Sequence, residues 1–314
     1  MSRAVLRVFR AGPHVTFQDA GRPGMKRFGV TRSGAMDRDA FDAAQAALGV
    51  RPGATAIEIS LGGLVIDCLE GEVGFALTGG GFRARLAGEM LGDWLVAGLG
   101  AGQRLEILPG FWGSWAILAL AGEIAVPQWL GSSSTHGPTG LGGGRLLAGQ
   151  EIVVEEAATM APRHGPIPRP AGARPRAEMR VVTGPQERFF DAATMGLLTE
   201  APFTLSPAYD RMGVRLDGPP LRPVAALDMP SEPICRGAIQ VNGEGVATVL
   251  LADHQTTGGY PKIATVIGPD IDRLAQMRAR DRLVFRAVSP EEAAAAARTR
   301  AATRARWLGA LARR

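Results

Sequence analysis

The sequence is poor in the residues that build disulfide frameworks, zinc sites and membrane spans. Its 314 residues include two cysteines and four histidines, too few for a disulfide framework or a zinc site of paired cysteines. Because Cys68 and Cys235 lie in apolar stretches, we expect both to be buried, reduced thiols. No run approaches the ~18 consecutive apolar residues of a membrane span, and the N-terminus lacks the apolar core of a signal peptide. We therefore expect a cytoplasmic protein with no metal site and no membrane contact.

Motifs of several common enzyme classes are also missing. The glycine-rich stretches Thr78–Gly81 and Gly140–Gly144 match neither a phosphate-binding loop nor a dinucleotide fingerprint that opens a helix. The sequence holds no serine nucleophile elbow and no metalloprotease helix, and it has no Met-Lys-Met segment of a biotin carrier. The basic residues behind the net charge of +5 are spread along the chain, with only 6% aromatic residues. We therefore expect no nucleic-acid partner.

The sequence contains one pattern twice. Early segments recur 173 residues later (Leu6 to Met179), and later segments recur 178 residues on (Gly80 to Gly258). The matched pairs are Leu6–Val8 with Met179–Val181, Ser33–Arg38 with Ser206–Arg211, Gly80–Phe82 with Gly258–Tyr260, and Arg104–Leu105 with Arg282–Leu283. An offset that is constant, grows once and is constant again indicates a duplicated domain with one insertion. The added residues fall in or beside Asp253–Thr257 of the second copy.

Short apolar runs bounded by turn residues dominate both halves of the chain. Glycine and proline contribute 42 and 22 residues, and they separate runs whose lengths suit strands. The runs are Ala4–Phe9, Leu64–Cys68, Val73–Leu77, Arg104–Leu108, Ala116–Leu120, Ile152–Glu155, Arg180–Val182, Ile239–Val241, Val246–Ala252, Ala264–Ile267 and Arg282–Phe285. The pattern predicts a mainly β fold.

Helical patterns are few. The alanine-rich stretch Asp37–Leu48 carries acids early and ends at Gly49, and Ile271–Met277 is a shorter candidate. The tail begins with Ser289, followed by proline and two glutamates, which is typical of a capped helix start. We therefore predict two copies at 1–110 and 177–288, an insert with a Pro/Arg-rich linker at 111–176, and a C-terminal helix at 289–314.

Two turn-rich strings carry candidate site residues. In the string around Gly21, Asp19 and Arg22 either present a guanidinium to an anion or pair with each other to pin the loop. Asp210 and Arg211 lie in a string that has a counterpart in the other copy. A feature kept in both copies favours turn closure and helix capping.

The string Asp253–Lys262 (DHQTTGGYPK) has the densest set of chemical groups. Because it follows an apolar run, it begins where a buried strand leaves the core. His254 has the chemistry to move a proton near neutral pH, oriented by Asp253 or Asp210. Lys262 has the charge to fix a carboxylate or phosphate, and the two glycines let a ligand approach the backbone.

Four strings resemble the biotin-dependent carboxyltransferase family, whose members are also called allophanate hydrolase subunit 2 and the C-type subunit of 5-oxoprolinase. They are QDAGRPG (Gln18–Gly24), SGAMD (Ser33–Asp37), SPAYDRMGVRLDG (Ser206–Gly218) and LLADHQTTGGYPKIATVI (Leu250–Ile267). The resemblance runs from about residue 5 to residue 287. It implies tandem cyclophilin-like β-barrels.

The resemblance also implies partners and cofactors. Family members work with a related cyclophilin-like protein, either allophanate hydrolase subunit 1 or the B-type subunit of 5-oxoprolinase. In the 5-oxoprolinase setting a lactam-utilisation subunit joins them, and ATP drives the opening of 5-oxo-L-proline to glutamate. In urea carboxylase the related module moves a carboxyl group from carboxybiotin to urea.

The site expected from these strings combines catalytic and substrate-binding residues. The catalytic candidates are Asp210, His254 and Lys262. The substrate-binding candidates are Arg211, Gln255, Thr256, Thr257, Gly258, Gly259, Tyr260, Asp19 and Arg22. Both family chemistries require a small amide to be polarised beside an anionic group, carboxybiotin or phosphate.

Three functions remain open from the sequence. The preferred one is a subunit of an ATP-dependent 5-oxoprolinase, inactive alone. The second is a carboxyltransferase subunit served by a separate biotin carrier. The third is a non-catalytic partner of a sensor-kinase inhibitor, which needs only a surface for the related subunit.

Overall fold

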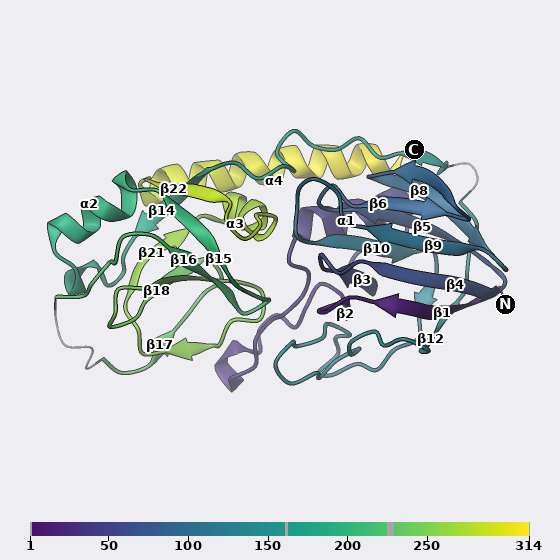
Figure 1. Cartoon of the computed structure of the whole chain (residues 1–314), viewed down its shortest axis with the longest axis horizontal. Coiled ribbons are helices and arrows are strands. Elements are labelled where there is room, and N and C mark those ends of the chain that lie inside the picture. The colour runs from purple at the N-terminus through teal and green to yellow at the C-terminus, as the bar shows by residue number, and fades with distance from the viewer. Residues whose placement is uncertain (1, 161–162, 225–228, 314) are drawn as a thin grey trace. The chain divides into compact units, whose positions relative to one another are not determined.

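A computed structural model describes residues 2–160, 163–224 and 229–313 (Figure 1). Its contacts divide the chain into two compact units. The first unit holds residues 2–22, Ser33–Arg174 and 304–313, and the second holds Pro23–Arg32 and Pro175–Thr303. The short segment Pro23–Arg32 therefore belongs to the second unit although its neighbours on both sides belong to the first. The domain boundaries predicted at residues 110, 176 and 288 stay a prediction.

The first unit is built from two sheets. The seven-stranded sheet has the order β11(Glu123–Ile124), β12(Glu151–Glu155), β1(Arg3–Ala11), β4(Leu64–Glu70), β9(Arg104–Leu108), β6(Arg83–Leu86) and β7(Glu89–Gly92). The six-stranded sheet has the order β13(Gly165–Pro166), β8(Leu95–Gly100), β5(Glu72–Thr78), β10(Ala116–Leu120), β3(Ala56–Ile59) and β2(Thr16–Gln18). Neighbouring strands are antiparallel throughout.

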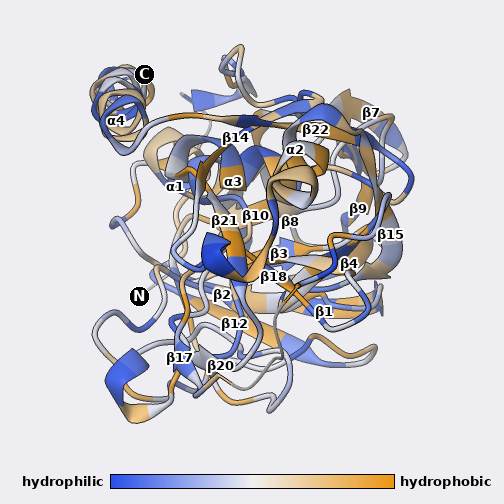
Figure 2. Ribbon diagram, turned by 90° about the vertical axis from the view of Figure 1, so that its left-hand side faces the viewer, coloured by the Kyte–Doolittle hydropathy of each residue, from blue (hydrophilic) through white to orange (hydrophobic). Residues whose placement is uncertain are grey.

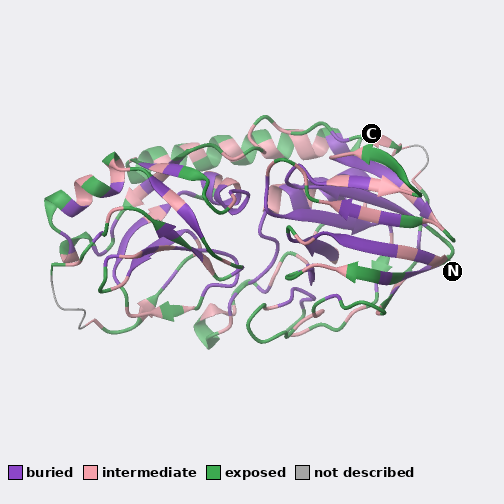
Figure 3. Ribbon diagram, viewed as in Figure 1, coloured by how far each residue is buried: buried purple, intermediate pink, exposed green. Residues whose placement is uncertain are grey.

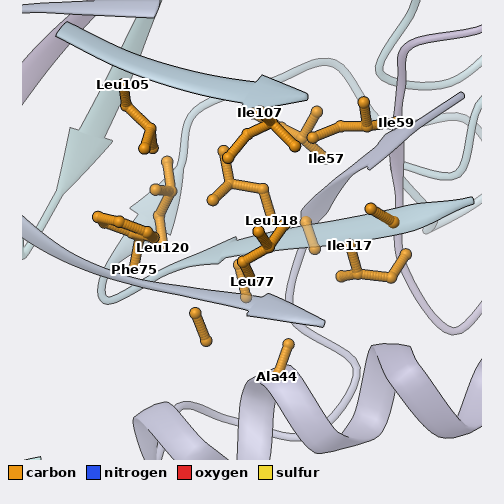
Figure 4. Packing of buried hydrophobic residues seen from close by; sticks show 14 of the residues in the cluster. Ala44, Ile57, Ile59, Phe75, Leu77, Leu105, Ile107, Ile117, Leu118 and Leu120 are labelled. Atoms are coloured by element: carbon orange, nitrogen blue, oxygen red, sulfur yellow. The ribbon is translucent and has the colours of Figure 1, made fainter. Parts of the chain in front are cut away.

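The core of the first unit lies between these sheets. Leu105 of β9 faces Phe75 of β5 and Leu120 of β10, and Ile107 of β9 faces Leu77 and Leu118 of the same two strands (Figure 4). Every residue of β10 is buried, and β5 is buried after its first residue, Glu72 (Figure 3). Side chains alternate between the faces of a strand, so a strand buried on both faces must be covered on both. Helix α1 (Arg38–Leu48) provides that second cover on β5 and β10.

Helix α1 begins and ends where the sequence predicts. The Asp37 side chain accepts a hydrogen bond from the backbone N–H of Ala40 at 3.0 Å, which satisfies one of the donors left open at a helix start. Gly49 closes the helix in the left-handed region with φ of 69°. The serine start of the C-terminal helix is also confirmed, because Ser289 and Glu292 exchange side-chain-to-backbone hydrogen bonds.

The second unit is a closed barrel of seven strands. Their order is β14(Glu178–Thr183), β21(Lys262–Val266), β18(Ala238–Val241), β19(Ala247–Leu250), β16(Gly213–Asp217), β15(Phe203–Tyr209) and β22(Arg282–Ala287). The parallel pairing of β22 with β14 closes the ring, so each of the seven strands has a neighbour on both sides. A small two-stranded sheet pairs β17(Glu232–Pro233), which precedes β18 in the chain, with β20(Thr257–Gly258), which precedes β21.

Helices and short turns complete the second unit. They are the 3₁₀ turns η1(Lys26–Phe28) and η3(Glu187–Phe189) and the helices α2(Ala192–Glu200), α3(Gly268–Ala275) and the start of α4(Pro290–Ala312). Helix α4 carries polar and apolar residues around its whole circumference, and most of it is exposed (Figures 2 and 3). Its last residues belong to the first unit, where Leu311 is buried and Trp307 donates to the Pro168 carbonyl.

The structure confirms the predicted mainly β class with a C-terminal helix. Of the two barrels predicted in tandem, the second unit forms a closed one, whereas the described part of the first unit is built from two sheets. One local expectation is wrong, because Cys235 is exposed rather than buried. The expectation of turn closure and helix capping is confirmed, one role in each unit: Asp37 caps α1, whereas Asp210 follows β15 and closes the turn into β16. The same short sequence pattern therefore serves a helix start in one unit and a strand turn in the other.

No helix in the described ranges combines the length and the apolar character needed to cross a membrane.

The N-cap of α1 can be tested by substitution. We expect Asp37→Ala to lower the free energy of unfolding by about 1 kcal/mol, because one helix donor loses its acceptor. Asp37→Asn, which keeps an acceptor oxygen, is the matched control and should stay close to the parent. Urea unfolding followed by circular dichroism measures both variants. Equal destabilisation by the two substitutions would show that the cap bond is not the cause.

Candidate functional site

A pocket of about 370 Å³ lies on the barrel of the second unit. We call it the barrel pocket. Its polar lining consists chiefly of Asp210, Arg215, Gln240, Asn242, Gln255 and Tyr260. These side chains come from the β15–β16 turn, from β16, from β18 and the turn after it, and from the segment between β19 and β21. Of the residues predicted from sequence, Asp210, Gln255 and Tyr260 are brought together here.

Asp210 is held by the turn it closes. Its Oδ1 accepts hydrogen bonds from the backbone N–H groups of Met212 at 2.7 Å and Gly213 at 3.2 Å. Its Oδ2 has no hydrogen-bond partner among residues 2–160, 163–224 and 229–313. The turn therefore orients the carboxylate while leaving one oxygen to accept a ligand N–H.

Gln240 fixes the opposite wall of the pocket. Its buried amide accepts from Gln255 Nε2 at 3.1 Å and donates to the Tyr260 carbonyl at 3.3 Å. A side chain at Gly258 would place its Cβ 2.7 Å from Gln240 Nε2, so the segment needs glycine at this point. The amide of Gln240 thus ties both ends of the segment from Gln255 to Tyr260 to strand β18.

Arg215 and Asn242 are pocket residues that the sequence analysis missed. Arg215 is exposed on β16 and forms no ion pair within the described part of the chain. Asn242 Oδ1 accepts from the backbone N–H groups of Glu244 and Val246, so its amide nitrogen remains a donor. Arg215 lies within Ser206–Gly218, one of the strings that carry the family resemblance. Its position in that string is the feature of the sequence that could have identified it as a site residue.

Arg211 contacts a protein carboxylate and is not among the residues that line the barrel pocket. Its guanidinium forms a forked ion pair with Asp253, with Nε–Oδ2 at 2.8 Å and Nη2–Oδ1 at 3.1 Å. The two side chains are 2% and 0% exposed. The backbone N–H of Asp253 also donates to the Arg211 carbonyl at 2.8 Å. Arg211 therefore joins the β15–β16 turn to the end of β19, and its charge is already balanced by a protein carboxylate.

His254 is paired with a lysine that the sequence analysis did not identify. Lys26 of η1 places its Nζ 3.2 Å from His254 Nε2 and 3.4 Å from the Ile234 carbonyl. The Nδ1 atom of His254 lies 2.6 Å from the Gln255 carbonyl. With an ammonium donating to one nitrogen and a carbonyl accepting from the other, the imidazole is neutral. The carbonyl of Gln255, rather than Asp253 or Asp210, orients the ring.

Burial and the nearby Lys26 charge lower the pKa of His254 to about 4. Burial also lowers the pKa of Lys26. A buried ring beside a cation resists protonation, so the His254 imidazole is neutral near pH 7. Its role as a catalytic residue that moves a proton stays a prediction. No sequence pattern near Lys26 indicated the pairing, since 228 positions separate the two residues.

Lys262 is likewise committed to protein groups. Its Nζ donates to Glu232 Oε2 at 3.1 Å and to the Pro233 carbonyl at 3.2 Å. Gln186 accepts from the Lys262 backbone N–H and donates to Glu232. The anion that Lys262 holds here is Glu232, and the barrel pocket does not include it.

The remaining predicted residues of this string shape the backbone. Thr257 and Gly258 form β20, and the Thr256 carbonyl accepts from the Ile234 backbone N–H at 3.0 Å. Gly259 has open space around its Cα, since the nearest atom to the position that a Cβ would take, the Met229 carbonyl oxygen, is 3.6 Å away. Their roles as ligand contacts stay a prediction.

Asp19 and Arg22 lie in the first unit and hold the loop Trp129–Ser134. Asp19 accepts hydrogen bonds from the Ser134 and Ser132 hydroxyls at 2.6 and 2.7 Å and from the Ser133 backbone N–H at 2.8 Å. Burial opposes ionisation, but these bonds outweigh it and hold the pKa of Asp19 below its usual value. Arg22 donates to the Trp129 and Ser134 carbonyls. Both residues hold a loop in place, as one of the two alternatives expected. They do so by bonding to residues 129–134 and not by pairing with each other.

Within the described ranges, no three His, Cys, Asp or Glu side chains gather closely enough to hold a metal ion.

Comparison with known proteins finds similarity along most of the chain. The family model described as carboxyltransferase domain, subdomain A and B, matches residues 28–287. The chain is 35% identical to the C subunit of 5-oxoprolinase from Escherichia coli (strain K12), over 92% of this chain and 93% of that protein. It is 34% identical to the C subunit of 5-oxoprolinase from Haemophilus influenzae, over 89% and 90%. A putative urea carboxylase of Emericella nidulans is 31% identical over 91% of this chain, which spans 24% of that protein.

Solved structures give the same picture. TTHA0988 superposes with a TM-score of 0.81 at 30% identity, covering 90% of this chain and 55% of its own, so this chain spans about half its length. The urea amidolyase of K. lactis superposes with a TM-score of 0.86 over 98% of this chain and 20% of its own. At 23% identity, that second likeness shows the fold alone.

The pairing of Lys26 with His254 predicts how the protein responds to acid. An unfolded histidine titrates near pH 6.5, so between pH 6.5 and about 4 the unfolded state binds the extra proton. Stability should therefore fall as the pH drops through this window. Lys26→Met should raise the His254 pKa, because one of its two main causes is removed. Histidine ring NMR titration measures the pKa, and urea unfolding at several pH values measures the stability.

Arg27→Met is the matched control for this prediction. It removes the neighbouring, exposed cation of η1 and should leave the His254 titration unchanged. A His254 resonance that titrates near pH 6.5 in the parent protein would contradict the buried, neutral ring.

Proposed function

Because the chain belongs to the carboxyltransferase domain family of subdomains A and B, we propose that it is the C-type subunit of an ATP-dependent 5-oxoprolinase. That complex converts 5-oxo-L-proline to L-glutamate. The observation that carries the proposal is the barrel pocket, in which one cation, one donor and two acceptors remain uncommitted within the described structure. Those groups are Arg215, the amide nitrogen of Asn242, Asp210 Oδ2 and the side-chain oxygen of Gln255.

The substrate and the pocket are complementary group by group. 5-Oxo-L-proline carries one carboxylate and one lactam, whose N–H donates and whose C=O accepts. A guanidinium pairs with a carboxylate through charge-assisted hydrogen bonds, which assigns the substrate carboxylate to Arg215. The Asn242 amide nitrogen then donates to the lactam C=O. Asp210 or Gln255 accepts from the lactam N–H, so the ring is held at both polar ends.

The same groups suit the chemical step. Opening the lactam draws electron density onto its carbonyl oxygen, and a donor fixed in advance stabilises that charge. Asn242 is fixed because two backbone N–H groups hold its Oδ1. Asp210, held by its turn, is the group placed to exchange a proton with the ring nitrogen. His254 is not assigned this role, since its ring stays neutral near pH 7.

ATP belongs to this proposal at the level of the complex. The described residues present no glycine-rich phosphate loop opening a helix, so we assign the nucleotide to a partner. The partners in this proposal are a related cyclophilin-like subunit and a lactam-utilisation subunit. The proposed location is the cytoplasm, where such an assembly meets ATP.

Carboxyl transfer from carboxybiotin to a small amide is the second candidate. It is favoured by the description of the matching family and by the relative named putative urea carboxylase. The pocket fits this chemistry as well, because Arg215 provides a cation for a carboxylate and the amide-binding groups are unchanged. When bound, carboxybiotin supplies the carboxyl group, and the pocket residues hold the acceptor amide.

Reconstitution separates the two candidates. The chain mixed with its partner subunits should release L-glutamate from 5-oxo-L-proline only when ATP is present. Carboxyl transfer would instead need bicarbonate and a biotinylated carrier and would leave 5-oxo-L-proline unchanged. A purely regulatory chain would add nothing to the activity of its partners in either assay.

Arg215 provides the sharpest test of the pocket. We expect Arg215→Gln to lower kcat/KM for 5-oxo-L-proline about 10- to 100-fold, mainly through KM, because a charge-assisted bond to the substrate carboxylate is lost. Its unfolding midpoint should not change, since Arg215 is exposed and has no ion-pair partner in the described structure. Steady-state kinetics of the reconstituted complex measure the effect.

Arg286→Gln is the control for Arg215→Gln. Arg286 is an exposed arginine of the same barrel, but it is paired with Glu178 at 3.0 Å and lies outside the pocket. It should leave the kinetics unchanged. Parent-like kinetics for Arg215→Gln would remove the barrel pocket from the proposal.

A further inference from the structure

A second hollow, of about 360 Å³, lies in the first unit. One wall is the segment that follows α1, from Leu48 to Arg51. The other wall comes from the start of β11 at Glu123 and from the residues after β12, including Glu156 and Met160. We call this space the α1 hollow. Its size falls within the range of small-molecule sites, and it shares no residue with the barrel pocket.

The α1 hollow is lined by opposite charges that do not meet. Arg51, Glu123 and Glu156 are exposed at its walls, and none forms a side-chain hydrogen bond or ion pair within the described ranges. The amide of Gln128, a fourth lining residue, is also uncommitted there. One arginine and two glutamates therefore surround the same space. In the described structure, each lies beyond ion-pair distance of an opposite charge. A ligand that carries both a positive and a negative charge would bridge the space between them.

Many charges of this unit pair across neighbouring strands, as in Arg7–Glu151 at 3.0 Å and Arg104–Asp67 at 2.6 Å. Other exposed charges, such as Glu70 and Arg145, stand without an ion pair in the described ranges. What distinguishes the α1 hollow is that unpaired charges of both signs line the same space.

We propose that the α1 hollow binds a small α-amino acid, with Arg51 taking its carboxylate and Glu123 and Glu156 taking its ammonium group. Guanidinium and carboxylate are the side chains that recognise these two groups by charge-assisted hydrogen bonds. The three charged walls sum to one negative charge, so an amino acid with an additional cationic side chain is preferred. A ligand that carries a carboxylate but no ammonium, as 5-oxo-L-proline does, lacks half of the match. The site therefore stands independently of the proposed function.

The test is ligand binding to the full chain. Isothermal titration calorimetry with L-lysine, L-alanine and L-glutamate should give affinities in that order, with L-glutamate weakest because it adds a negative charge. Methylammonium and acetate, each carrying half of the zwitterion, should bind far more weakly than L-alanine. Ligand-induced shifts of the unfolding midpoint provide a second readout, since a ligand that binds only the folded state stabilises it.

Substitutions locate the binding. Arg51→Gln, Glu123→Gln and Glu156→Gln should each weaken L-lysine binding about tenfold or more, because each removes one charge-assisted contact. Glu70→Gln, an exposed glutamate at the end of β4, is the control and should bind as the parent does. Circular dichroism confirms that each variant is folded before binding is measured.

Three results would overturn the proposal. The first is the absence of heat and of stabilisation with all three amino acids. The second is acetate or methylammonium binding as tightly as the zwitterions, which would indicate simple ion pairing at the surface. The third is binding that persists unchanged in all three variants while the control also binds, which would place the ligand elsewhere.

Discussion

The buried ion pair of Arg211 and Asp253 is the constraint on which the barrel pocket depends. It joins the turn that carries Asp210 to the segment that carries Gln255, so two walls of the pocket are set by one contact. Removing one partner of a buried pair leaves an uncompensated charge, at a cost of about 3–5 kcal/mol. The pocket is open to solvent, but the Arg211–Asp253 pair that positions two of its walls is buried.

Polar residues in this chain fall into those that build the frame and those left for a ligand. Lys262 is bound to Glu232, and His254 is bound to Lys26. Arg215 and Asn242, by contrast, keep donors with no protein acceptor in the described structure. The distinction matters because a group already neutralised by the protein has little to offer a substrate. Lys262 and His254, two of the three predicted catalytic residues, therefore contact other protein groups, and Arg215 and Asn242, which were not predicted, line the pocket.

The regular elements followed from local patterns. Strands Arg104–Leu108 and Ala116–Leu120 lie where the apolar runs placed them, because each run is as long as a strand and is bounded by turn residues. The cap at Asp37 followed from one residue type before an alanine-rich stretch. Helix α2 was missed because it is apolar on most sides and contains a glycine, so it carries no amphipathic period.

The sequence by itself determined the class of fold, the starts of two capped helices, α1 and α4, and three members of the candidate site. It did so because strand length, capping and turn closure depend on neighbours within a few positions. Only the tertiary structure decided which charged groups are paired with other protein groups and which are left for a ligand. Arg211 meets Asp253 42 positions away, and Lys26 meets His254 228 positions away. Whether such partners meet depends on how the barrel closes and on where a distant segment packs, and no local pattern contains that information.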